Sequence, residues 1–265
     1  MSNLTNATLV NPTLVNATPV NATLVIGAGS KIAQSLITEL ADNESDHPVV
    51  AVSRAGNPEL SQKLGTNLRW LISDYSEQSI NDIGNLLEQE AVNFKRVFIC
   101  NGLLHDAELQ PALQPEKRLE ELQLHSMLQS FTANTLVPML WLKALKPLLA
   151  GGDDVVVTVF SARVGSIADN HKGGWYSYRA AKAALNMYLK SAALELNRER
   201  PRVRILAFHP GTTDTPLSKP FQKSVPEGKL FTPQFVAEQL LSIVANLPAE
   251  PAMQFLDWDG QQVEW

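Results

Sequence analysis

Residues 23–33 read Thr-Leu-Val-Ile-Gly-Ala-Gly-Ser-Lys-Ile-Ala, a short apolar run that passes through two glycines into a helix-favouring segment. Glycines at such a turn let the backbone approach a pyrophosphate closely, and the first N–H groups of the following helix stay free to bind it. The alternative is a turn that only joins a strand to a helix, because Lys31 and Ala33 stand where further glycines would be expected.

Short β-rich runs and longer helical runs alternate through the rest of the chain. Continuous apolar strands separated by helices indicate a parallel sheet that is covered on both faces. We therefore predict an α/β protein with one Rossmann-fold domain, a doubly wound parallel sheet of about seven strands with helices on both faces. The expected strands are 23–26, 48–53, 68–72, 95–100, 154–160, 203–208 and 252–256, and the expected helices are 31–42, 58–64, 76–90, 126–149, 175–199 and 233–246.

The chain divides into a short extension and one folded domain. Residues 1–22 are predicted to be a flexible, low-complexity extension, because they repeat a five-residue theme that fits neither a helix nor a strand. Residues 23–265 are predicted to form the domain. Within it, the irregular stretch 101–125 is expected above the carboxyl ends of the strands, where ligands bind in such sheets.

Composition argues against several classes of protein. The net charge is −5 and no Lys/Arg block is present, so nucleic acid is not expected as a partner. No apolar run reaches membrane-spanning length without a charge or a proline, so no membrane association is expected either. The single cysteine, Cys100, fits a reducing compartment, and we expect a cytoplasmic protein. The five histidines show no metal-ligand spacing, and no metal site is predicted.

Tyr178 stands four residues before Lys182 in an alanine-rich, helix-favouring run. One turn of helix places both side chains on one face. A cation held near a tyrosine favours the phenolate and brings its pKa down from about 10, toward useful acid/base work. Taken alone, the same spacing also fits an amphipathic helix with a half-buried tyrosine and a solvated lysine.

The second predicted strand ends in Ser53-Arg54, without an acidic residue that would accept hydrogen bonds from an adenosine ribose. An arginine suits a 2′-phosphate instead, because its planar donors match phosphate oxygens, and Lys31 could add a second positive charge. The sequence therefore favours NADP over NAD. The alternative is that Arg54 is only an exposed loop cation.

Together these motifs resemble those of short-chain dehydrogenases/reductases, in order and in spacing, over residues 23–265. The further matches are Asn101-Gly102 after the fourth strand, Asn134 in the following long helix, a serine after the fifth strand, and Pro210-Gly211 with Thr215 after the sixth. Residues 161–170, 173–179 and 209–221 look like the C-factor and sniffer carbonyl reductase branch of that family.

The resemblance implies a catalytic set of Tyr178, Lys182, Ser161 and Asn134. Tyr178 would exchange a proton with the carbonyl oxygen while hydride passes between nicotinamide and carbon. Lys182 would hold the nicotinamide ribose, and Asn134 would order a water that leads protons to the lysine. With the glycine turn and the end of the second strand, the expected cofactor-binding set is Gly27, Gly29, Ser30, Lys31, Ile32, Ser53, Arg54, Asp74, Asn101, Gly102, Tyr178, Lys182, Pro210, Gly211, Thr212 and Thr215.

The serine after the fifth strand departs from the family pattern. The family usually has two serines there, of which the second polarises the substrate carbonyl, but this chain reads Ser161-Ala162. Alternation along a strand would turn Ser161 away from the position of Ala162 unless the strand ends there. We expect Ser161 to carry the role, because the chain is already leaving the strand, and Ser166 is the alternative.

We therefore predict an NADP-dependent oxidoreductase that acts on a small carbonyl or secondary alcohol. The resemblance implies a homodimer or homotetramer packed through 126–149 and 175–199. A regulatory or signalling protein that binds the dinucleotide with little or no turnover is the alternative function. Arg163 and Arg179 either contact an anionic substrate or are surface cations. The substrate pocket is expected to include Leu103, Leu104, His105, Leu217, Phe221 and Phe231, and Trp258 and Trp265 are expected to close over it or to join an interface.

Overall fold

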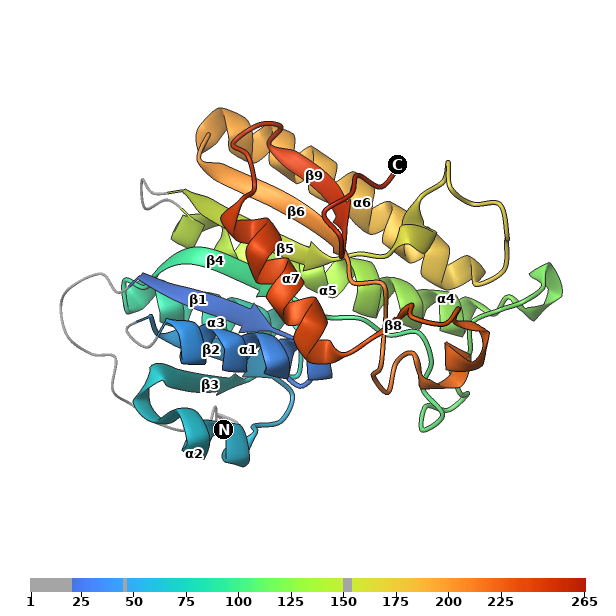
Figure 1. Ribbon diagram of the computed structural model, residues 1–265, viewed down its shortest axis with the longest axis horizontal. Helices are drawn as coiled ribbons and strands as arrows, with labels where there is room; N and C mark the ends of the chain where they lie inside the picture. The colour runs from blue at the N-terminus through green and yellow to red at the C-terminus, as the bar shows by residue number, and fades with distance from the viewer. Residues whose placement is uncertain (1–20, 45–46, 150–153) are drawn as a thin grey trace, which may run out of the picture.

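The computed structural model describes residues 21–44, 47–149 and 154–265, and the predicted flexible extension over residues 1–20 lies outside these ranges. Seven parallel strands form one sheet, in the order β3-β2-β1-β4-β5-β6-β9 (Figure 1). The predicted Rossmann-type α/β fold is confirmed. The strands are β1 (Asn21–Ile26), β2 (Val49–Ser53), β3 (Leu68–Ile72), β4 (Asn93–Ile99), β5 (Val155–Phe160), β6 (Val203–His209) and β9 (Met253–Asp257).

The first strand begins earlier than its sequence predicts. Asn21 and Ala22, expected in the extension, belong to β1 and pair with Asn93 and Phe94 of β4. Ala22 is fully buried. Backbone pairing and burial therefore bring the last two residues of the predicted extension into the sheet, although their local sequence matches the repeats before them.

Helices cover both faces of the sheet (Figure 1). One face carries α1 (Lys31–Asn43) and α7 (Pro233–Ala245), with α2 (Pro58–Leu64) toward the β3 edge. The other face carries α3 (Glu77–Gln89), α5 (Val137–Leu145) and α6 (Tyr176–Glu199). These helices lie within two residues of the predicted ranges, apart from the long helix expected over 126–149.

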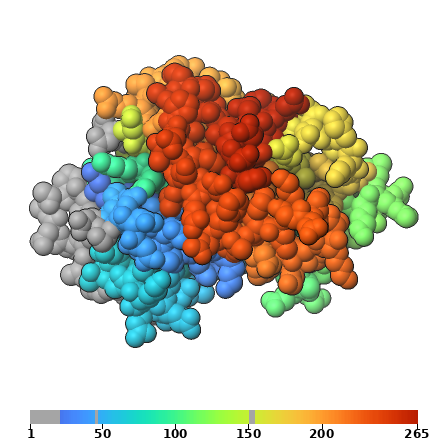
Figure 2. Space-filling view, viewed as in Figure 1, coloured from blue at the N-terminus to red at the C-terminus, as the bar shows by residue number. Residues whose placement is uncertain are grey.

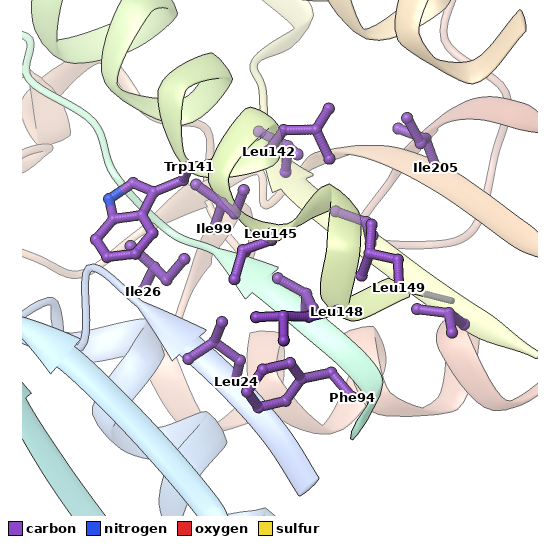
Figure 3. Close-up of a cluster of buried hydrophobic side chains, with 14 of the residues drawn as sticks. Leu24, Ile26, Phe94, Ile99, Trp141, Leu142, Leu145, Leu148, Leu149 and Ile205 are labelled. Atoms are coloured by element: carbon purple, nitrogen blue, oxygen red, sulfur yellow. The ribbon is translucent and has the colours of Figure 1, made fainter. Parts of the chain in front are cut away.

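Each strand supplies both halves of the core. In β1, Leu24 and Ile26 pack toward α3, α5 and α6, whereas Val25 between them packs toward α1 and α7. Figure 3 shows the first of these halves, where Phe94 of β4 and Trp141 of α5 lie among leucines between the sheet and the helix. Full burial of one such side chain stabilises the fold by roughly 1.5–3 kcal/mol, so the two apolar layers fix which way each helix faces.

The helix expected over 126–149 is helical without a gap from residue 124 to residue 149, but its winding changes along the way. It consists of α4 (Leu124–Phe131), a π-helical turn (Thr132–Leu136), α5 and a 3-10 turn (Lys146–Leu149). Pro138 stands in the first turn of α5 and has no N–H to donate to the preceding turn, which accounts for the widened π turn. The widened turn contains Asn134.

The segment between β6 and α7 contains two short strands that the sequence analysis did not predict. β7 (Thr212–Thr213) pairs with β8 (Leu230–Phe231), and the 3-10 helix η6 (Lys219–Ser224) lies between them. In Figure 2 this orange segment forms part of the right-hand surface. The β7–β8 pairing fixes both ends of the segment beside the carboxyl ends of the main strands.

Candidate active site

A cleft of about 1390 Å³ opens at the carboxyl ends of the strands, around the point between β1 and β4 where the strand order reverses. A single drug-sized ligand fills a pocket of about 300–1,000 Å³, so this cleft has room for two ligands. The predicted site residues that line it are Gly27, Gly29, Ser30, Lys31, Ile32, Ser53, Arg54, Asn101, Gly102, Ser161, Tyr178, Lys182, Pro210, Gly211, Thr212 and Thr215.

The glycine turn forms the floor of the cleft. Gly27 has a φ of +78°, and a Cβ there would lie 2.9 Å from the backbone carbon of Cys100, so only glycine fits between the two chain segments. The hydroxyl of Ser30 caps α1 by accepting from the N–H of Ala33. The helix N-terminus opens on the cleft at Lys31 and Ile32, and its free N–H groups and positive dipole end fit a pyrophosphate.

Two cations line the cleft, Arg54 directly after β2 and Lys31 at the first position of α1. Arg54 and Lys31 are exposed on the cleft and make no ion pair within the described part of the chain. The neighbouring Ser53 hydroxyl is already committed, since it donates to the Ala55 carbonyl (2.5 Å) and accepts from the Trp70 indole N–H (2.9 Å). An anion at this end of the cleft would meet the two cations rather than the serine.

The end of β3 differs from the expectation. Asp74 does not line the cleft, because its carboxylate turns to the N–H of Ser76 (2.8 Å). Tyr75, with a φ of +64°, lines the cleft in its place. Beside it, the side-chain oxygen of Asn101 is buried and has no hydrogen-bond partner among the described residues. An orphaned acceptor in a ligand-sized cleft fits a ligand N–H, such as an adenine amine.

Tyr178 and Lys182 meet in the wall of the cleft, as their spacing predicts. Lys182 is only 1% exposed, and its Nζ donates to the Phe160 carbonyl at the end of β5 (2.8 Å). The same Nζ lies 5.9 Å from the centre of the Tyr178 ring. The alternative of a solvated lysine on a helix surface is therefore wrong.

Burial controls the protonation of this pair. Loss of water lowers the pKa of Lys182 to about 7 and raises the pKa of Tyr178 to about 12. Burial therefore opposes the expected lowering of the tyrosine pKa, because it disfavours the charged form of both groups. At neutral pH Tyr178 is a phenol that can donate a proton.

Glycine also positions Lys182. The 3-10 turn η5 (Arg163–Gly165) packs directly on α6, and a Cβ on Gly165 would lie 2.7 Å from the Cβ of Lys182. The sequence gives no sign that Gly165 must be a glycine. Its backbone has no positive φ, and only the close approach of η5 to α6 excludes a larger residue.

A buried carboxylate, Glu116, holds the N-terminus of α6. Its oxygens accept from the N–H of Ser177 (3.1 Å) and from the Ser177 hydroxyl, and its backbone carbonyl accepts from the N–H of Trp175. Trp175 at the N-cap position supplies no side-chain cap of its own. The stretch 101–125 therefore provides the negative group that the N-terminus of α6 favours. This N-terminus lies two residues before Tyr178.

Asn134 has a structural role that differs from the expected one. Its side chain is fully buried and outside the lining of the cleft. Its oxygen accepts from the Leu103 N–H (2.9 Å), and its amide donates to the Leu103 carbonyl (2.7 Å) and to the Ser130 carbonyl (2.9 Å). With both amide hydrogens committed, the side chain clamps the chain after Asn101-Gly102 to the π turn.

The serine question has a partial answer in the structure. Ser166 does not line the cleft, and its hydroxyl accepts from the Asp169 N–H (3.0 Å), so the alternative to Ser161 is wrong. Ser161 lines the cleft, but its hydroxyl donates to the side-chain oxygen of Asn186 (2.6 Å). The side-chain nitrogen of Asn186 has no partner among the described residues. Rotation of that amide by half a turn would let it donate to Ser161 and free the hydroxyl proton for a ligand.

Arg163 and Arg179 do not face the ligand space. Arg163 binds the buried carboxylate of Asp257 (2.8 Å), and Arg179 donates to the Gly174 carbonyl (2.9 Å) and the Val164 carbonyl (3.2 Å). Neither arginine lines the cleft. Both hold the loop between β5 and α6, so neither is available to contact an anionic substrate.

The substrate half of the cleft is mostly apolar. Of the residues expected there, Leu104, Leu217, Phe221 and Phe231 line it, whereas Leu103 and His105 do not. Trp258 lines the cleft, but Trp265 packs against Phe255 instead. Lining residues that sequence reasoning missed include Phe160, Ala162, Val164, Lys172, Trp175, His209 and Lys229. Ala162, Val164, Trp175 and His209 stand in the stretches that resemble the family, but that resemblance gave them no role, and only the fold brings all of these residues together.

Two further properties follow from the described ranges. No helix within them combines the length and apolar character needed to span a bilayer. In the same residues, no group of three or more His, Cys, Asp or Glu side chains is arranged to hold a metal ion.

Comparison with known proteins decides the family. The family model described as short chain dehydrogenase matches residues 21–226. The chain belongs to the short-chain dehydrogenase/reductase family of oxidoreductases. The 1-hydroxy-2-glutathionyl-2-methyl-3-butene dehydrogenase of Rhodococcus sp. (strain AD45) is 30% identical to this short-chain dehydrogenase over 242 residues, which are 91% of this chain and 98% of that protein. The C-signal protein of Myxococcus xanthus is 33% identical over 147 residues, 56% of this chain and 83% of that protein.

Solved structures share the fold of this chain. The carbonyl reductase Sniffer of D. melanogaster superposes with a TM-score of 0.78 and 19% identity, and covers 93% of this chain and 100% of its own. The NADPH-bound carbonyl reductase from chicken fatty liver superposes with a TM-score of 0.75 and 22% identity, over 94% and 100% of the two chains. The predicted resemblance to the C-factor and sniffer branch is confirmed.

Proposed function

We propose that this short-chain dehydrogenase is NADP-dependent and transfers hydride between the nicotinamide and a carbonyl or secondary alcohol, with Tyr178 as the general acid/base. The observation that carries the proposal is the Tyr178–Lys182 pair in the wall of a cleft large enough for cofactor and substrate together. The relative that is 30% identical to this chain is a dehydrogenase, and an NADPH-bound carbonyl reductase shares its fold.

The residues at the other end of the cleft fit the cofactor. The N-terminus of α1 would bind the pyrophosphate, the orphaned Asn101 oxygen would accept from the adenine, and Arg54 with Lys31 would bind a 2′-phosphate. The bound nicotinamide supplies or accepts the hydride. Pro210, Gly211 and Thr212 would hold the nicotinamide end.

Tyr178 is suited to donate a proton in the direction of reduction. Its pKa of about 12 keeps it protonated at neutral pH, and a carbonyl oxygen that gains negative charge would draw that proton. The Lys182 pKa of about 7 lets the lysine change its charge in the same pH range. Lys182 can then supply positive charge when Tyr178 loses its proton.

The direct test is NADPH oxidation with a panel of aldehydes and ketones by wild type and Tyr178→Phe. We expect Tyr178→Phe to lower kcat by a factor of about 10²–10⁴, the usual contribution of a general acid. Tyr176→Phe is the matched control, because Tyr176 stands two residues earlier on the same helix and is exposed. Equal turnover in Tyr178→Phe and wild type would remove Tyr178 from the reaction.

Cofactor preference is tested at Arg54. Arg54→Asp should weaken NADPH binding by about 10- to 100-fold, because a hydrogen bond to a charged group contributes about 1.5–3 kcal/mol, while NADH binding changes little. Arg202→Asp is the control, an exposed arginine just before β6, at the opposite end of the sheet. An unchanged NADPH/NADH ratio in calorimetry would contradict the assignment of Arg54.

One observation favours the regulatory alternative. Ala162 stands where the family usually has its carbonyl-polarising serine, and the Ser161 proton is donated to Asn186. Under this alternative the protein binds NADP(H) tightly and turns over none of the carbonyls. Calorimetry and the turnover panel together distinguish the two functions.

We also propose a homodimer or homotetramer. Large apolar side chains are exposed along α4 and α6, among them Leu124, Leu128, Met187, Tyr188 and Leu194. Apolar exposure of this extent on two neighbouring helices is typical of an interface. Light scattering should give a multiple of the 29.1 kDa chain mass, and Met187→Glu should shift the distribution toward the monomer.

A further inference from the structure

Two aromatic side chains, Trp175 and Phe221, form a wall beside Tyr178, which we call the aromatic wall. Their ring centres are 4.9 Å apart, and the Trp175 ring centre lies 6.4 Å from that of Tyr178. Both line the cleft. Trp175 precedes α6 and Phe221 belongs to η6, so the contact joins two segments that are distant in sequence and encloses the cleft next to the proton donor.

Trp175 is held in a backbone conformation that costs free energy. Its φ of +52° and ψ of +42° are left-handed, which is strained for a bulky residue. Gly173 and Gly174 before it are also left-handed, at φ values of +63° and +65°. The backbone carbonyl of the buried Glu116 accepts from the Trp175 N–H and holds this turn in place. Strain that the surroundings maintain indicates that the position of the ring matters for function.

The imidazole of His105 lies beside the aromatic wall, with its ring centre 5.8 Å from that of Phe221. Leu104, Val164 and Leu217 add apolar side chains to the lining of the same cleft. Among the charged residues that line the cleft, Lys172 is the nearest to Trp175 in sequence, and it is exposed. Aromatic rings pack favourably in tilted or offset pairs with centres about 4.5–7 Å apart. A group attached to the reacting carbon, next to the Tyr178 hydroxyl, would therefore lie beside the aromatic wall.

We infer that Trp175 determines substrate specificity. The substrate is an aldehyde or ketone whose carbonyl carbon carries an aryl group, or the corresponding alcohol. This inference rests on the proposed function. The carbonyl oxygen accepts the Tyr178 proton, the carbonyl carbon accepts hydride from NADPH to give the alcohol, and the aryl group packs on Trp175.

The test compares acetophenone with cyclohexyl methyl ketone, two uncharged ketones that share a carbon skeleton and differ in the flatness of the ring. We measure kcat/KM for both with wild type, Trp175→Leu and Trp175→Phe. All three keep a Cβ at the strained position, so backbone strain changes little. We expect Trp175→Leu to lower the acetophenone/cyclohexyl ratio about tenfold, the upper end of what an aromatic pair contributes, and Trp175→Phe to restore most of it.

Binding of both ketones to the NADP-saturated protein is measured in parallel by equilibrium dialysis, with wild type and Trp175→Leu. Turnover with an equal loss on both ketones in Trp175→Leu would overturn the inference and leave the proposed function standing. A binding preference for acetophenone that depends on Trp175, without turnover, would support the aryl site and contradict the oxidoreductase proposal. Absence of both turnover and preference would overturn both.

Discussion

Replacement of Gly165 by alanine tests whether close packing of η5 on α6 sets the position of Lys182. The new Cβ would lie 2.7 Å from the Lys182 Cβ and 2.9 Å from its carbonyl carbon, whereas ordinary contacts begin near 3.4 Å. The turn and the helix must therefore separate by about 0.7 Å. Neither moves freely, because the Gly165 N–H is bonded to the Ala162 carbonyl and the Lys182 Nζ to the Phe160 carbonyl.

Overpacking of this kind lowers the free energy of unfolding by about 1–3 kcal/mol. For a chain of this size the melting temperature falls by roughly 2–4 °C for each kcal/mol. A displacement approaching 1 Å at a catalytic group can lower kcat by up to about 100-fold. Gly165→Ala should therefore lose stability and activity together.

Urea unfolding followed by circular dichroism gives the stability term, and NADPH oxidation gives kcat. Gly56→Ala is the control for stability, because a Cβ there has only Ile72 within reach, at 4.0 Å, and Gly56 needs no left-handed backbone. An unfolding free energy for Gly165→Ala equal to that of Gly56→Ala would refute the packing argument. Normal stability with lost activity would refute the link between strain and the position of Lys182.

Two further predictions concern the same helix. Burial lowers the pKa of Lys182 from 10.5 to about 7, so between these pH values the unfolded chain binds more protons than the folded chain, and wild type should gain stability with rising pH relative to Lys182→Met. Urea midpoints of both proteins at pH 7, 8 and 9 measure this gain. The same change of midpoint with pH in both proteins would contradict the burial of an uncharged lysine. Glu116→Ala should lower the free energy of unfolding by about 2 kcal/mol through loss of the α6 cap. The exposed Glu120→Ala is the control and should leave the free energy of unfolding unchanged. Equal urea midpoints for the two variants would show that the cap contributes nothing.

The sequence by itself determined the fold and the pairing of Tyr178 with Lys182. Apolar strand runs alternate with helical runs so regularly that burial on both faces allows little but a doubly wound parallel sheet, and β3 lies where it was predicted. The Tyr178–Lys182 spacing is local, because one helical turn places the two side chains together whatever the rest of the chain does. The glycine turn is local in the same sense, since it follows directly from β1 and opens α1.

Contacts that the sequence does not reveal decided the rest. The side chain of Asn134 binds the Leu103 backbone, and Asp74, which was expected among the cofactor-binding residues, binds the N–H of Ser76. Sequence position does not reveal the direction of a polar side chain, because that direction depends on which backbone groups the fold leaves without partners. The roles of Gly165, Glu116 and Trp175 were not predicted either, because each contacts α6 from a residue outside that helix and only the fold brings them together. Burial, a property of the whole fold, raises the pKa of Tyr178.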